Sequence, residues 1–192
     1  MKRNIAKIVS FALGMPWLAV IMYVMLHGTG LSDEQYRFFV QIFLIFSFIV
    51  PATFFAWEYR KGEISDADVT KRSQRYKLLT LVCASNFVTL ACAYVYGTPL
   101  LYHLMLGVTL VLLAVYVITF FWKISLHMTF NVVGISMINV LNDWQFMYLY
   151  ALIPVIFWSR RLLRKHTPWQ LVAGFAVSQA ILLGVAVWYG LA

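Results

Sequence analysis

The chain has 192 residues, of which 62% are hydrophobic and 11% are charged, with a formal net charge of +8. Water-soluble domains are about 45–50% apolar and about 25% charged, so this composition excludes an ordinary soluble fold. A chain of this length cannot bury so much apolar surface in its own core, and the sequence therefore predicts a single integral membrane domain over residues 1–192.

The apolar runs predict an all-α fold, a polytopic transmembrane bundle of six or seven helices. A helix needs about 20 apolar residues to cross the hydrocarbon core, and runs that are continuously apolar favour helices over strands. The fifth and sixth runs are short for complete crossings. In chain order, the expected spans are roughly 8–27, 38–57, 78–96, 100–121, 126–141, 146–158 and 171–191.

The segments between the expected spans differ in charge. Of the 15 basic residues, all except Arg37 lie at the N-terminus, in 58–77, at Lys123 or in 159–166. Counting spans puts these segments on the same side as the N-terminus, and the positive-inside rule makes that side cytoplasmic. We therefore expect a multi-pass protein of the cell membrane, with its N-terminus and basic segments in the cytoplasm.

Three polar segments on that basic side carry arginine, lysine, serine and histidine: 66–77, 122–127 and 159–170. Hydrolysis of a phosphate ester needs cations and hydrogen-bond donors around the dianion, a nucleophile and a general acid. Arginine makes bidentate contacts to phosphate, and histidine can act as nucleophile or acid. By residue type alone, the same groups also fit a passive anion-binding site.

Two of these segments contain serine and histidine at defined spacings. Ser159-Arg160 is followed by five residues and then His166, and Ser125 and His127 form a Ser-x-His element. These patterns resemble the last and middle motifs of the type 2 phosphatidic acid phosphatase family, which is related to vanadium-dependent haloperoxidases.

The resemblance implies a phosphatase-like core at about residues 66–190. In that family pattern His166 is the nucleophile, His127 is the acid for the leaving group, and Arg160 and Ser125 bind phosphate. The resemblance also implies that no metal or other cofactor is needed and that vanadate would occupy the same site.

The family's first motif, lysine, six residues and Arg-Pro, is matched only loosely. Arg75 is the counterpart of its arginine, and either Lys71 or Lys123 supplies the charge of its lysine. The aspartate that ends the last motif and orients the nucleophilic histidine is replaced by Gln170. A glutamine carbonyl can hold the imidazole tautomer, but it cannot stabilise an imidazolium as a carboxylate does.

The sequence thus predicts a lipid phosphatase that acts on a phosphatidate-like monoester or an isoprenoid diphosphate through a phosphohistidine. Two alternatives stay open: a non-catalytic lipid-phosphate binder or transporter, and a magnesium-dependent transferase that uses Asp66 and Asp68. The expected partners are the bilayer and a lipid phosphate. Nothing in the sequence indicates nucleic acid, and a homo-oligomer is left open.

Overall fold

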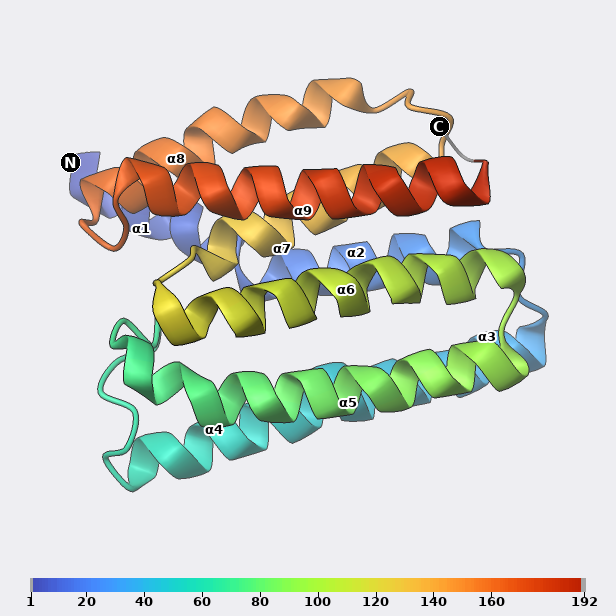
Figure 1. Ribbon diagram of the computed structural model, residues 1–192, viewed down its shortest axis with the longest axis horizontal. Coiled ribbons are helices and arrows are strands. Elements are labelled where there is room, and N and C mark those ends of the chain that lie inside the picture. Colours follow the sequence, from blue (N-terminus) through green and yellow to red (C-terminus); the bar gives the residue numbers. More distant parts are fainter. Residues whose placement is uncertain (1, 191–192) are drawn as a thin grey trace. The chain divides into compact units, whose positions relative to one another are not determined.

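The computed structural model of the protein describes residues 2–190, apart from the side chains of residues 15–21 (Figure 1). It is 81% helix, and no strand occurs in the residues described, which confirms the all-α prediction. The chain packs into two compact units. We call them the terminal unit (Met1–Thr29 with Ile124–Ala192) and the central unit (Gly30–Lys123).

The central unit contains three long helical stretches. Its elements are α3 (Asp33–Phe43), η1 (Leu44–Ile49), α4 (Val50–Arg60), η2 (Arg72–Gln74), α5 (Arg75–Tyr96) and α6 (Pro99–Phe121). The first stretch begins at a capping box between Ser32 and Gln35. It runs on through a π-helical turn just before Pro51, whose missing N–H interrupts the regular hydrogen bonds. Thr98 caps α6, and α5 and α6 form an antiparallel hairpin (Figure 1).

The terminal unit combines shorter helices with one long helix. Its elements are α1 (Lys2–Ala12), α2 (Met15–Gly28), α7 (Leu126–Val140), η3 (Met147–Ala151), α8 (Leu152–Leu162) and α9 (Pro168–Tyr189). α7 packs against α2, α8 and α9, and its residues from Asn131 to Asn139 are all buried. Met128, Ile156 and Leu171 join three of these helices in one apolar cluster. In a bilayer, such a cluster stabilises the fold mainly through van der Waals packing.

The single helix expected over residues 8–27 is divided in the structure. α1 and α2 are separated at Leu13 and Gly14, because Gly14 has non-helical backbone angles and Pro16 cannot donate a hydrogen bond to the preceding turn. Asn131 on α7 donates its Nδ2–H to the Leu13 carbonyl at 2.7 Å, which satisfies part of the interrupted backbone. The expectation of one continuous first span is therefore corrected.

Four helical stretches in the described residues are long and apolar enough to cross a membrane, judged by length and composition: Asp33–Arg60, Arg72–Tyr96, Pro99–Phe121 and Pro168–Tyr189. They fall on the second, third, fourth and last of the expected spans, and they indicate membrane association. α7 has 15 residues and α8 has 11, so the two short apolar runs form short helices. A bundle of six or seven crossings is not confirmed.

Candidate anion-binding and catalytic site

The Ser-Arg pair of the last motif lies in the final turn of α8. Ser159 and Arg160 are each 1% exposed, and the Ser159 hydroxyl donates back to its own helix at 3.0 Å. α8 ends in a Schellman turn, in which Lys165 N–H donates to the Arg160 carbonyl and Arg164 N–H donates to the Arg161 carbonyl. Arg164 has a φ of 54°, a left-handed conformation that glycine usually adopts at this position. This tight turn leads directly into the segment that carries the predicted nucleophile.

His166 lies between α8 and α9 and is 5% exposed. Its Nδ1 is 3.2 Å from Oε1 of Gln170, which also accepts the Thr167 N–H at 3.1 Å in the capping box that begins α9. A carbonyl oxygen can only accept, so Nδ1 carries the proton, and Nε2 of the neutral imidazole is then unprotonated. Gln170, the predicted orienting residue, therefore contacts the imidazole of His166.

The Arg160 guanidinium contacts the first helix of the chain. Its Nη1 donates to Oγ of Ser10, in the last turn of α1, at 2.5 Å, across 150 positions of sequence. α1 packs along α8, and this packing brings the two side chains together. The sequence analysis missed Ser10, because it stands alone in an apolar stretch and no motif spacing relates it to Arg160.

Ser125 begins α7 and joins it to α9. It is fully buried, its Oγ accepts the Met128 N–H at 3.4 Å, and its own N–H donates to the Gln170 carbonyl at 3.2 Å. One turn along α9, a Cβ at Gly174 would be 3.0 Å from the Ser125 carbonyl, so glycine lets the two helices approach this closely without displacing a neighbour. The middle and last motifs therefore meet at the starts of α7 and α9.

His127 lies in the first turn of α7, next to the break between α1 and α2. A Cβ at Gly14 would be 3.6 Å from Nε2 of His127 and 3.1 Å from the Ser10 carbonyl, so the imidazole and the last turn of α1 flank the same glycine. Asn131 donates to the carbonyls of both His127 and Leu13 at 2.7 Å. This asparagine fastens the helix break to the turn that carries His127.

The three remaining predicted phosphate ligands lie in the central unit. Arg75, at the start of α5, is 2% exposed, and its Nε donates to the Val69 carbonyl at 2.8 Å. Lys71 is exposed just before η2, and Lys123 is half-buried at the end of the unit. These three stay predictions as phosphate ligands. The five predicted site residues of the terminal unit, in contrast, belong to one cluster of connected helix ends.

The Asp66 carboxylate folds the loop that precedes α5. It accepts the N–H groups of Asp68 and Thr70 at 3.1 Å each and the Thr70 hydroxyl at 2.8 Å. Hydrogen bonds of this kind are typical of aspartate in a turn. Within residues 2–190, apart from the undescribed side chains, no group of three or more His, Cys, Asp or Glu residues could hold a metal ion. The observed contacts thus give Asp66 a loop-forming role.

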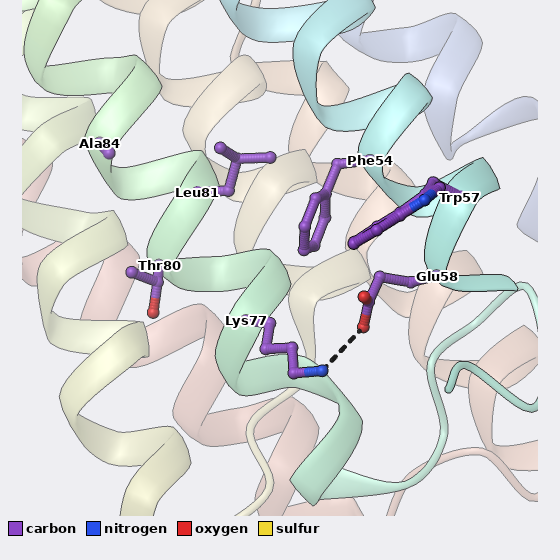
Figure 2. A pocket seen from close by; sticks show the side chains of 7 residues that line it. All are labelled: Phe54, Trp57, Glu58, Lys77, Thr80, Leu81 and Ala84. Atoms are coloured by element: carbon purple, nitrogen blue, oxygen red, sulfur yellow. Dashed lines mark hydrogen bonds and ion pairs between the residues drawn. The ribbon is translucent and has the colours of Figure 1, made fainter. Parts of the chain in front are cut away.

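An open groove of about 580 Å³ lies between α4 and α5 in the central unit (Figure 2). At one end of it, Oε2 of the buried Glu58 is 3.4 Å from Nζ of Lys77. The groove is lined by Phe54, Trp57, Glu58, Lys77, Thr80, Leu81 and Ala84. None of the predicted site residues is in this lining.

The terminal unit is strongly basic. Its basic residues are Lys2, Arg3, Lys7, Arg160, Arg161, Arg164 and Lys165. Its one acidic side chain, Asp143, follows the far end of α7, which at 1.5 Å per residue is about 20 Å from the end that carries Ser125 and His127. The seven basic side chains against one acidic side chain give this unit a net positive charge, which favours an anionic ligand.

No family model, characterised protein or solved structure matches the chain. The chemistry of the site therefore follows from its own groups: one histidine held in a defined tautomer, a second histidine, a capping serine and a buried arginine. Such a set can bind a dianion, attack phosphorus and protonate a leaving oxygen.

Proposed function

We propose that the chain is a membrane-embedded lipid phosphatase that hydrolyses a phosphate monoester or an isoprenoid diphosphate through a phosphohistidine. The proposal follows the resemblance to the type 2 phosphatidic acid phosphatase family. The observation that carries it is the 3.2 Å hydrogen bond from Nδ1 of His166 to Gln170, in the turn that also holds the buried Arg160. A nucleophilic nitrogen and a phosphate-binding cation are thus held by the same few residues.

In the proposed reaction, Nε2 of His166 attacks phosphorus while the bond from phosphorus to the leaving oxygen breaks. His127 gives its proton to that oxygen. Arg160 and Ser125 hold the phosphoryl oxygens, and Ser125 has its hydrogen available because its Oγ accepts from a backbone N–H. Water then attacks phosphorus, the phosphorus–nitrogen bond breaks and His127 accepts the proton of the water. Both histidines return to their starting states.

The proposed setting is the cell membrane, with the chain as a multi-pass bundle of six or seven helices and the motif segments in the cytoplasm. The four long apolar helices support the membrane setting, and the concentration of basic residues in the motif segments supports the orientation. The lipid phosphate reaches the site from the bilayer. Arg75, Lys71 and Lys123 are the candidates for additional phosphate contacts.

One observation favours a second candidate function, a non-catalytic lipid-phosphate binder or transporter. The group at Nδ1 of His166 is the neutral Gln170, which cannot offset the charge of a phosphoimidazolium as a carboxylate would. Gln170→Glu keeps the side-chain length and the capping box while it adds that charge. For a phosphatase, we expect this variant to release phosphate faster than the wild type. For a binder, neither protein releases phosphate.

Phosphate release by the purified full-length chain in detergent tests the main proposal. The substrates are phosphatidate, phosphatidylglycerophosphate and isoprenyl mono- and diphosphates, with EDTA present. The variants are His166→Ala and a matched control, His27→Ala, in which an exposed histidine of α2 that hydrogen-bonds within its own helix is lost. We expect wild type and His27→Ala to release phosphate and His166→Ala to release none. If no lipid gives release, the phosphatase proposal is wrong, and binding without release supports the carrier.

A further inference from the structure

The last turn of α1 carries a serine whose hydrogen bonds differ from those of several hydroxyls in the other helices. Helical serine and threonine side chains commonly donate to the carbonyl four residues earlier. Those that do so here include Thr80, Thr89, Thr109, Thr119 and Ser178. Ser10 does not follow this pattern. Its Oγ accepts from Nη1 of Arg160, and its hydroxyl hydrogen goes to no acceptor in the described part of the chain.

The Ser10 hydroxyl therefore has one donor to offer beside a cation. A hydroxyl has one hydrogen and two lone pairs, and the guanidinium uses a lone pair. Arg160 is 1% exposed and Ser10 is half-buried, so the guanidinium lies where its charge is poorly screened by water. Phosphate oxygens only accept hydrogen bonds, and a hydroxyl donor next to a guanidinium is the arrangement that binds them.

Two observations place this turn of α1 next to the turn of α7 that carries His127. Gly14, one turn after Ser10, separates the Ser10 carbonyl from Nε2 of His127. Asn131 holds the carbonyl of Leu13 and that of His127 with the same amide group. The end of α1 is thus fixed to the proposed general acid on one side and to the proposed phosphate ligand Arg160 on the other.

We infer that Ser10 is a further phosphate ligand, so that the first helix of the chain completes the anion site. The inference rests on the proposed function. The ligand is a phosphate monoester, or the terminal phosphate of a diphosphate. One of its oxygens accepts the Ser10 O–H while Arg160 binds the same phosphoryl group, and the hydrogen bond between the two side chains keeps the guanidinium in place.

Four full-length proteins test this inference: wild type, Ser10→Ala, Ser10→Thr and the control Ser178→Ala, which removes a buried hydroxyl that hydrogen-bonds within α9. The measurements are kcat and KM with the preferred lipid phosphate, the inhibition constant of orthovanadate, and the thermal midpoint with and without inorganic phosphate. Loss of one hydrogen bond to a charged group should raise KM and the vanadate constant about 10-fold or more in Ser10→Ala. Ser10→Thr, which keeps a hydroxyl, should recover most of that loss, and Ser178→Ala should match wild type.

The outcomes separate the ligand role from a structural one. If Ser10→Ala lowers the phosphate-free midpoint but leaves KM and vanadate inhibition unchanged, Ser10 only supports the fold and the inference is overturned. If wild type releases no phosphate, the proposed function fails. The thermal shift caused by inorganic phosphate then decides about Ser10, because a ligand role requires a smaller shift in Ser10→Ala than in wild type. If phosphate shifts neither protein, the inference fails as well.

Discussion

Glu58 in the central unit and Arg160 in the terminal unit are both buried charged side chains, and their contacts differ. In the central unit, the buried Glu58 has a basic partner, because Lys77 lies 3.4 Å away and also lies 3.6 Å from Glu63. In the terminal unit, the buried Arg160 contacts a serine hydroxyl, and the one acidic side chain of that unit lies beyond the far end of α7. Glu58 thus has a counterion within its own unit, whereas the basic residues of the terminal unit far outnumber its acidic side chain, which suits that unit to an anionic ligand.

The helices of the two units also differ in length and continuity. The central unit contains three of the four stretches that are long enough to cross a membrane, and each is continuous. The terminal unit contains one such stretch, together with a helix pair broken at Gly14 and the short helices α7 and α8. Helix ends expose unpaired N–H groups and bring side chains from several segments together, so ligand sites are often built from them. The candidate site lies at such ends.

The largest expected effect is that of Arg160→Met. Methionine fills a similar volume without a charge, so phosphate release should fall at least about 100-fold, as expected for loss of a major transition-state contact. Activity assays measure this loss, and thermal unfolding of the same preparation checks that the variant is folded.

Glu58→Gln provides the control from the other unit. Lys77 is 63% exposed, so solvent screens its pair with Glu58, and the stability loss should stay below about 1 kcal/mol. Phosphate release should equal that of wild type. A loss of activity here would contradict the contrast between the two units.

A smaller effect is expected for Gly174→Ala, which tests the contact between α7 and α9. The new Cβ would be 3.0 Å from the Ser125 carbonyl and 3.2 Å from Cβ of Met128, so these neighbours must shift by a few tenths of an ångström. Overpacking of this kind costs about 1–3 kcal/mol, and it should also lower kcat several-fold by displacing Ser125 from Gln170. Thermal unfolding and steady-state kinetics measure the two losses.

Gly184→Ala is the matched substitution in the same helix. No atom lies within 4 Å of the position of its added Cβ, so alanine should stabilise α9 by about 0.5–1 kcal/mol with no change in kcat. Equal behaviour of the two variants would mean that the approach of α9 to Ser125 does not matter for activity.

The smallest effect is expected for Arg164→Gly. Arg164 occupies the left-handed position of the Schellman turn with a φ of 54°, where glycine is favoured by about 1 kcal/mol. The variant should therefore be slightly more stable than wild type in thermal unfolding, with an unchanged KM. A higher KM would identify Arg164 as a substrate contact in place of a turn residue.

Much of the local architecture of the site could be predicted from the sequence. The four-residue spacing of His166 and Gln170, with Thr167 and Pro168 between them, marks the start of a helix, and a capping box at this start does place Gln170 against the imidazole. The serine of Ser125-x-His127 likewise becomes the N-cap of α7. These contacts lie within one helical turn, so spacing alone determines them.

The sequence by itself determined the membrane association, the helical class and the local contacts at the starts of α7 and α9. Each of these depends on composition or on neighbours within a few residues. Only the tertiary structure decided that the first helix breaks at Gly14, that Ser10 meets Arg160 and that Gly174 lets α9 reach Ser125. Those features join residues far apart in the chain. A lone serine or glycine in an apolar run carries no sign of its distant partner, since helix packing alone selects it.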